Sequence, residues 1–298
     1  MDYVSVRTGA DEFLSACLPT TRVGASPGSW QWGGGGTRDR YWTVGRNGSA
    51  AVCTVEGCTE LPTNTGYLLT GVFSIDDHSV WVTGGAQLVY RCDEYSCTKI
   101  QAEQPGNAQA AWGTDINNTW VVGGYQNGVV YRCQSSGCTP IYSDPVAWEF
   151  LAVSGASPDG VWAVGQAGGV IRCTTAGCTQ VPSGLTNRLL NVWVPEPDSA
   201  LVTGWDGVIL WCQGSSCRSV ASGTDKYLCS IRGSSLERVY IVGSNGTMLS
   251  CSNNRCDRMT MLTPVDLSKV LVPDDKSGWI VGGGGTVLRF YPSRVRRS

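Results

Sequence analysis

The chain contains 298 residues, of which only 15% are charged, compared with roughly 25% in an average soluble domain. Its net charge of −2 excludes a nucleic-acid-binding protein that works through bulk positive charge, and a content of 39 glycines and 14 cysteines is typical of neither a coiled coil nor a disordered chain. The apolar runs are much shorter than the roughly 20 residues of a transmembrane helix, so no membrane span is predicted.

The chain has a single histidine, His78. Zinc hydrolase sites, Ser-His-Asp triads and Cys-His dyads all use imidazole as a ligand or a base. His78 lies in an Asp-Asp-His-Ser segment that is typical of a surface loop. We therefore predict no catalytic residue, metal site or cofactor.

The first predicted element is a strand over residues 3–9. The segment from Ser5 to Asp11 (SVRTGAD) matches the segment from Ser219 to Asp225 (SVASGTD), which ends a later repeat. Residues 1–6 lack the basic and apolar regions of an export signal, although the cysteine content is typical of an oxidising compartment. We expect a secreted, periplasmic or cell-surface protein whose leader has been removed.

An inserted segment follows at residues 10–29 and contains Cys17. We hypothesise a disulfide between Cys17 and Cys229, which begins an innermost strand; two free buried thiols are the alternative. Directly after the insertion, the segment from Ser29 to Gly33 (SWQWG) fits either an innermost strand or a second strand of the first repeat.

Residues 30–292 contain seven repeats. Each repeat has a Trp, Leu or Tyr three residues before a glycine, and the spacing between these glycines is 39 residues, with one interval of 42. The glycines are Gly45, Gly84, Gly123, Gly165, Gly204, Gly243 and Gly282. Short runs of alternating apolar residues, bounded by Asn-Gly, Asp-Gly or Gly-Gly, indicate β-hairpins. Four strands in about 40 residues, repeated seven times, predict an all-β, seven-bladed β-propeller that forms one domain over residues 1–298.

Six of the seven repeats also contain a Cys-x4-Cys motif. Six pairs on six different blades are spread around a ring and cannot share a metal ion, so we predict disulfide-bonded hairpins between third and fourth strands. The predicted pairs are Cys53–Cys58, Cys92–Cys97, Cys133–Cys138, Cys173–Cys178, Cys212–Cys217 and Cys251–Cys256.

The last repeat differs from the others because the sequence ends after its third strand, at residues 286–290. Phe290 stands where the other repeats have the first cysteine. A hairpin between the third and fourth strands cannot exist there if these strands belong to opposite ends of the chain. We therefore expect residues 3–9 to form the fourth strand of blade 7 and to close the ring.

Strand order predicts two distinct faces. Turns between second and third strands share one face with the connections between blades, whereas the disulfide hairpins share the other face with the turns between first and second strands. Amide, guanidinium and aromatic groups on the first face suit a glycan or a protein ligand. The candidate ligand-binding residues are Arg46, Asn47, Tyr125, Gln126, Arg188, Trp205, Asp206 and Lys226.

Some of these residues have a purely structural alternative. The pairs Asn47-Gly48, Asn127-Gly128 and Asn245-Gly246 fit primed hairpin turns. Acidic residues such as Asp159 and Asp198 recur singly in the turns between first and second strands, so their spacing specifies no carboxylate pair for acid-base catalysis.

The repeat phrase from Val161 to Ile171 (VWAVGQAGGVI), followed by Val181 to Gly184 and Leu190 to Trp193, resembles the repeats of secreted bacterial propellers of the kind abundant in myxobacteria. It is more distantly similar to the propeller of photosystem II assembly factors. The resemblance covers nearly the whole chain and implies a fold and an exported bacterial origin more than an activity.

The sequence therefore favours an exported binding module that recognises a glycan or a protein on the face opposite the disulfides. One alternative is a hydrolase or lyase with a carboxylate, tyrosine or arginine site at the mouth of the channel. The other is a structural scaffold, including a homo-oligomer or a filament subunit.

Overall fold

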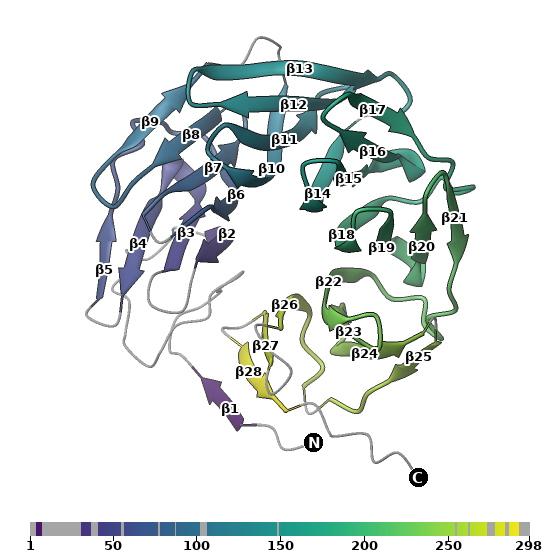
Figure 1. The fold of residues 1–298 in the computed structure, drawn as a ribbon. Helices are drawn as coiled ribbons and strands as arrows, with labels where there is room; N and C mark the ends of the chain where they lie inside the picture. Colours follow the sequence, from purple (N-terminus) through teal and green to yellow (C-terminus); the bar gives the residue numbers. More distant parts are fainter. Residues whose placement is uncertain are drawn as a thin grey trace.

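The computed structural model describes residues 4–7, 31–36, 41–54, 57–76, 78–86, 88–101, 106–147, 149–253, 255–261, 263–272, 278–283 and 286–291. These residues form seven antiparallel sheets of four strands, arranged as blades around a common axis (Figure 1). In this part of the chain the only helical elements are three single 3-10 turns. The predicted all-β, seven-bladed propeller is confirmed.

In blades 1 to 6 the strand order, from the axis outward, follows the sequence. Blades 1 and 2 consist of β2 (Gln31–Gly36), β3 (Tyr41–Gly45), β4 (Ala50–Thr54) and β5 (Gly57–Glu60), then β6 (Leu69–Ser74), β7 (Val80–Gly84), β8 (Leu88–Cys92) and β9 (Cys97–Ile100). Blades 3 and 4 consist of β10 (Asn107–Asp115), β11 (Asn118–Gly124), β12 (Gly128–Gln134) and β13 (Gly137–Asp144), then β14 (Phe150–Ser157), β15 (Gly160–Gly165), β16 (Val170–Thr174) and β17 (Gly177–Gln180). Blades 5 and 6 consist of β18 (Leu189–Glu196), β19 (Ser199–Gly204), β20 (Ile209–Gln213) and β21 (Ser216–Ser219), then β22 (Leu228–Ser235), β23 (Arg238–Gly243), β24 (Thr247–Ser252) and β25 (Arg255–Arg258).

Blade 7 is assembled from both ends of the chain. Its strands are β26 (Leu267–Leu271), β27 (Gly278–Gly282), β28 (Thr286–Phe290) and β1 (Val4–Arg7). β1 runs antiparallel to β28, with Val4 opposite Arg289 and Arg7 opposite Thr286 (Figure 1). The predicted closure of the ring by the N-terminal strand is therefore confirmed: β1 supplies the fourth strand of blade 7 and pairs with the outer edge of β28.

The two interpretations of the segment from Ser29 to Gly33 are now distinguished. β2 is the innermost strand of blade 1 and pairs only with β3, so the innermost-strand interpretation is correct. The predicted insertion at residues 10–29, including Cys17, lies outside the described residues.

The repeated tryptophan of the second strand packs between blades. Trp42, Trp81, Trp120 and Trp162 are at most 2% exposed. Each one packs against the following blade: Trp81, for example, lies in one cluster with Ala108, Val121 and Val129 of blade 3. Truncating a buried tryptophan to alanine costs about 3–5 kcal/mol of stability, so this residue explains why the repeat phrase recurs so regularly.

Five disulfides join third and fourth strands within the described residues. They are Cys92–Cys97, Cys133–Cys138, Cys173–Cys178, Cys212–Cys217 and Cys251–Cys256. In every pair the two cysteines are directly opposite in the strand register, with Cα atoms 3.9–4.0 Å apart. In blade 1, Cys58 is disulfide-bonded and lies opposite Cys53 in the register, but the side chain of Cys53 is outside the described part.

Candidate functional site

Hydrogen bonds between separate segments define one face of the ring, which we call the turn face. It comprises the turns between second and third strands and the connections between blades. The backbone N–H groups of Gly48, Gly168, Gly207 and Gly246 each donate to a carbonyl of the connection that follows, at 2.8–2.9 Å. The acceptors are Tyr67, Asn187, Lys226 and Val265. The structure thus confirms that these turns and connections share a face.

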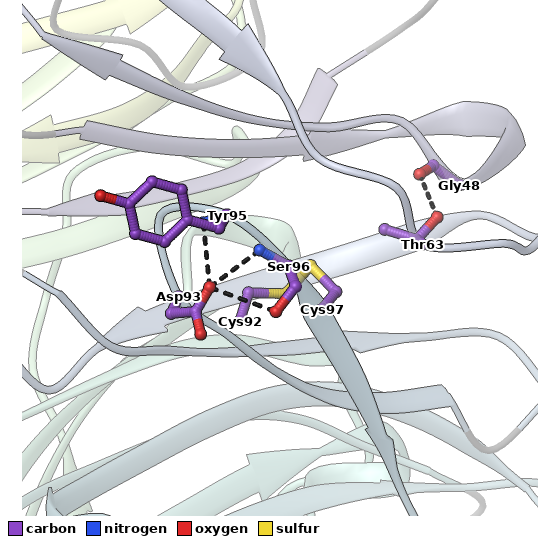
Figure 2. Close-up of a disulfide and its surroundings, with 7 residues drawn as sticks. All are labelled: Gly48, Thr63, Cys92, Asp93, Tyr95, Ser96 and Cys97. Carbon is purple, nitrogen blue, oxygen red and sulfur yellow. Dashed lines mark hydrogen bonds between the residues drawn. A yellow bond between two sulfur atoms is a disulfide. The ribbon is translucent and has the colours of Figure 1, made fainter.

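The opposite face, which we call the disulfide face, joins the Cys-x4-Cys hairpins to the turns between first and second strands. Gly214 N–H donates to Asp198 O at 2.9 Å, and Asn253 N–H donates to Leu236 O at 3.3 Å. The hairpins also satisfy their own polar groups: Asp93 Oδ1 accepts from the N–H groups of Tyr95 and Ser96 at 2.9 and 2.8 Å (Figure 2).

Acidic side chains on the disulfide face have structural partners. Asp159 accepts a hydrogen bond from Thr175 N–H at 2.9 Å, and Asp198 forms an ion pair with Arg172. Hydrogen bonds from Thr175 hold the pKa of Asp159 below its usual value. The Asp159 carboxylate thus joins a turn to the hairpin of its own blade, and the Asp198 carboxylate joins blade 5 to β16 of blade 4. Asp274 and Asp275 lie outside the described residues.

Exposed apolar side chains are concentrated on the turn face. Of the large apolar side chains that are exposed in the described part of the chain, five belong to its turns and connections: Tyr67, Tyr125, Val146, Trp205 and Tyr227. The disulfide face has Tyr95, at the tip of the blade 2 hairpin. Adjoining exposed apolar groups are typical of an interaction surface, and among these five side chains Trp205 and Tyr227 adjoin each other.

The largest aromatic group on the turn face lies over blade 5. The rings of Trp205 and Tyr227 are stacked, with centroids 5.0 Å apart and planes 23° apart. The guanidinium of Arg188 lies 5.6 Å from the centre of the Trp205 ring. We call Arg188, Trp205 and Tyr227 the aromatic cluster. The three side chains present cationic and aromatic surface in one place, since Trp205 is 38% exposed and Tyr227 is 45% exposed.

The local backbone places the Trp205 ring. Trp205–Gly207 forms the 3-10 turn η3, in which Asp206 and Gly207 have φ values of 56° and 69°. A Cβ at Gly207 would lie 1.8 Å from Thr224 O, so only glycine allows the turn to approach the connection this closely. Main-chain bonds from Trp205 N–H to Arg188 O and from Gly207 N–H to Lys226 O, both 2.9 Å, fix the turn.

An open hollow of about 590 Å³ lies beside the aromatic cluster, between the turns of blades 4 and 5. Its lining residues are Gln166, Ala167, Thr186, Asn187, Arg188, Trp205 and Asp206. Asn187 Nδ2 donates to Asp206 Oδ2 at 2.9 Å, which orients the carboxylate. A second open hollow of about 540 Å³ lies on the same face, beside Asn245 and Pro264. The turn face therefore has two open hollows, each lined by a turn and by the connection that follows it.

The predicted site residues are distributed unevenly. Arg188, Trp205 and Asp206 line the same hollow, and Lys226 directly precedes Tyr227. The other four are on separate blades: Arg46 and Asn47 in the turn η1 (Arg46–Gly48) of blade 1, and Tyr125 and Gln126 in blade 3. The structure thus groups three of the eight candidates around one hollow.

Two of the three expected primed turns have the required backbone. Asn47 and Gly48, like Asn245 and Gly246, have positive φ at both positions. The prediction for Asn127-Gly128 is wrong: Gly124 still pairs with Gly128, and the loop is the three residues between them, with positive φ at Gln126. The two extra residues of this repeat extend the strands before the chain turns.

Tyr227 was not predicted as a site residue. It is the residue immediately before the innermost strand of blade 6, as Arg188 is in blade 5. The sequence marks this repeat position, but it does not show that a residue from one connection stacks on a side chain from the preceding turn.

Cys229 does not form the bridge that the sequence suggested. Its thiol is free, and its Sγ lies 3.9 Å from Tyr227 O. Burial raises the pKa of this thiol to about 11, and the Asp266 carboxylate adds to the increase. The free thiol of Cys229 does not support the predicted Cys17–Cys229 disulfide, and Cys17 itself lies outside the described residues.

No protein-family model matches this chain, and a comparison with curated proteins finds no relative. Among solved structures, YCF48 from Cyanidioschyzon merolae has a TM-score of 0.67 and 14% identity, covering 91% of this chain and 98% of its own. YCF48 bound to D1 peptide has a TM-score of 0.68 and 16% identity, covering 98% and 97%. A streptogramin B lyase has a TM-score of 0.74 and 12% identity, covering 97% and 96%.

These likenesses show the fold alone. They agree with the expected distant similarity to photosystem II assembly factor propellers. Because a peptide-binding protein and a lyase share the architecture, the fold does not choose between a binding module and an enzyme.

Proposed function

We propose that this protein is an exported, disulfide-stabilised binding module that recognises a protein ligand through the turn face, centred on the aromatic cluster. The observation that carries the proposal is the exposed stack of Arg188, Trp205 and Tyr227 beside an open hollow. Tryptophan, tyrosine and arginine are the residues that contribute most often to the affinity of protein interfaces.

The geometry of the cluster favours a protein over a glycan. A sugar ring binds against a free aromatic face, but Tyr227 stacks on one face of Trp205 and the guanidinium of Arg188 lies over the same ring. What the cluster offers is a cation beside two stacked, partly exposed rings. This combination suits the mixed apolar and polar surface of a polypeptide.

Export is supported by the disulfides. Five bridges in one chain are typical of an oxidising compartment, because cytosolic thiols are kept reduced. Among the described residues, none forms a helix long and apolar enough to cross a bilayer. The similarity to YCF48, one structure of which holds a D1 peptide, supports a polypeptide ligand by analogy.

The test compares peptide and glycan binding by the oxidised protein. A random peptide library displayed on phage is selected against the wild type, and the protein is also applied to a glycan array. We expect selected peptides that bind the wild type and the variant Tyr95→Ala, on the disulfide face, but bind Trp205→Ala at least about tenfold more weakly. Glycan binding that depends on Trp205 would show that the ligand of this site is a sugar and not a protein. Ligands that are insensitive to Trp205 would refute the turn-face site.

A further inference from the structure

Two basic side chains lie on neighbouring innermost strands, away from the turn-face cluster. Arg232 belongs to β22 of blade 6, and Lys269 belongs to β26 of blade 7. The two strands are in direct contact, since Val270 N–H donates to Ser230 Oγ at 3.3 Å. Both side chains are partly buried and retain some solvent exposure.

Arg232 is held by neutral acceptors only. Its Nη1 donates to Ile231 O at 3.0 Å, to Val192 O at 3.4 Å and to Asn191 Oδ1 at 3.5 Å. Carbonyl and amide oxygens fix the position of a guanidinium but do not neutralise its charge. Burial lowers the pKa of Arg232, yet an arginine side chain stays protonated under ordinary conditions.

Lys269 has even fewer partners than Arg232. Of the residues that the structure describes, none forms a hydrogen bond or an ion pair with its ammonium group. Burial lowers the pKa of Lys269 to about 8, and the positive charge of Arg232 lowers it further in the same direction. At pH 7 the ammonium is therefore still mostly charged.

Two carboxylates, one just before β26 and one on the far side of the ring, have other hydrogen-bond partners. Asp266 precedes β26, and its Oδ1 accepts from Asn245 N–H at 2.9 Å on the turn face. Glu149, on the far side of the ring, accepts from Gln109 Nε2 at 2.6 Å and from Gln166 Nε2 at 3.2 Å. Within the described part of the chain, neither basic group forms an ion pair with a carboxylate.

We propose that Arg232 and Lys269, on the neighbouring innermost strands of blades 6 and 7, form a binding site for an oxyanion. Two partly buried cations that form no ion pair with any described carboxylate create a local positive potential, and a bound anion would offset the repulsion between them. Guanidinium and ammonium donors together match the oxygens of a sulfate, a phosphate or a carboxylate. This site is independent of the turn-face proposal, because no residue of the aromatic cluster contributes to it.

The experiment is a calorimetric titration of sulfate into the oxidised full-length protein at pH 7, with ionic strength held constant by sodium chloride. We expect saturable binding with a dissociation constant of about 1 mM, which corresponds to the affinity of a small two-cation site. The variant Lys269→Met keeps the length of the side chain and removes its charge, and should weaken binding at least about tenfold. The matched control Lys99→Met, on the exposed outer strand β9, should bind like the wild type.

Two further measurements separate folding from binding and identify the source of the anion. Lys269→Arg keeps the positive charge and should retain binding. Loss of binding in Lys269→Met together with binding in Lys269→Arg would show that the charge, and not a general disruption at this position, is what sulfate requires. A peptide of glutamates with blocked termini is titrated in parallel: binding of sulfate alone indicates a free anion, whereas binding of the peptide alone indicates a carboxylate of a protein ligand. Absence of saturable binding for both probes, or wild-type affinity in Lys269→Met, overturns the site.

Discussion

The two faces of the ring are built from the same repeats but differ in how their turns are fixed. On the disulfide face, each hairpin is held by a covalent bridge and by its own side chains, as Asp93 shows with Tyr95 and Ser96 (Figure 2). On the turn face, main-chain bonds such as Gly207 N–H to Lys226 O hold the turns. Side chains also bind these turns, as Thr63 Oγ1 donates to Gly48 O at 2.6 Å (Figure 2) and Asp266 Oδ1 accepts from Asn245 N–H at 2.9 Å. The rings of Trp205 and Tyr227 remain partly exposed and are available for recognition.

The largest expected effect concerns the covalent half of this comparison. Each bridge closes a short loop and contributes on the order of 2 kcal/mol, so the bridges together are comparable with a typical folding stability of about 5–15 kcal/mol. Full reduction should therefore unfold the protein or lower its melting temperature sharply, as measured by circular dichroism with and without reductant. An unchanged melting temperature would contradict the stabilising role of the disulfide face.

Removal of one bridge separates stability from binding. The double variant Cys212→Ala/Cys217→Ala, in the blade that carries Trp205, should lose about 2 kcal/mol of unfolding free energy in urea denaturation. Its affinity for a peptide selected against the wild type should stay within about twofold, because main-chain bonds on the other face position Trp205. A parallel loss of affinity would show that the two faces are coupled.

The variant Trp205→Ala tests the other half of the comparison. It should weaken ligand binding by about 10- to 100-fold, the usual effect of truncating a central interface tryptophan. The unfolding free energy should change by less than about 1 kcal/mol because the ring is exposed. Isothermal calorimetry and urea denaturation measure the two quantities. A large loss of stability with unchanged affinity would assign Trp205 to the fold instead.

A smaller effect is expected for Tyr125→Ala, on blade 3. Tyr125 is 70% exposed and belongs to a different turn from the aromatic cluster. If the ligand is centred on blade 5, affinity should fall by less than about threefold, since residues at the rim of an interface contribute little. An effect as large as that of Trp205→Ala would extend the site across the ring.

The smallest effect is a pH dependence on the disulfide face. The N–H of Tyr95 is the main cause that lowers the pKa of Asp93, so the stability that this carboxylate contributes is present above its unfolded pKa and is lost as the pH falls through its folded pKa. Asp93→Asn should therefore show a smaller decrease in melting temperature between pH 6 and pH 3 than the wild type. Because the group is largely exposed, the difference should stay under about 2 °C. Identical pH profiles would show that the bond contributes nothing.

The fold could be predicted in detail because each repeat contains four strand patterns, and in blades 1 to 6 these strands pair in the order in which they occur in the sequence. The regular spacing of the seven glycines from Gly45 to Gly282 predicted the number of blades. The absence of a cysteine at the position of Phe290 indicated that the ring is closed by a strand from the other end of the chain. The identity of the first strand of blade 1 was left open, since a glycine-rich segment such as Gln31–Gly36 has little side-chain pattern to distinguish an inner strand from a second strand.

The candidate site could be predicted only in part. Strand order was enough to place Arg188, Trp205 and Asp206 on the face opposite the disulfides. It could not show that Tyr227 stacks on Trp205, because this contact joins a turn of one blade to the connection that leads into the next. The expected bridge from Cys229 failed for a related reason: spacing shows that two cysteines are left over, but not that they meet.

By itself, the sequence determined the number of blades, the closure of the ring, the hairpin disulfides and the division into two faces, because these follow from periodicity and from strand order along the chain. Only the tertiary structure decided which exposed side chains stack together, that the thiol of Cys229 is free, and that Arg232 and Lys269 lie on neighbouring innermost strands that are in contact. The reason is physical: such neighbours come from different blades, and their distances are set by how the blades pack rather than by their separation in the sequence.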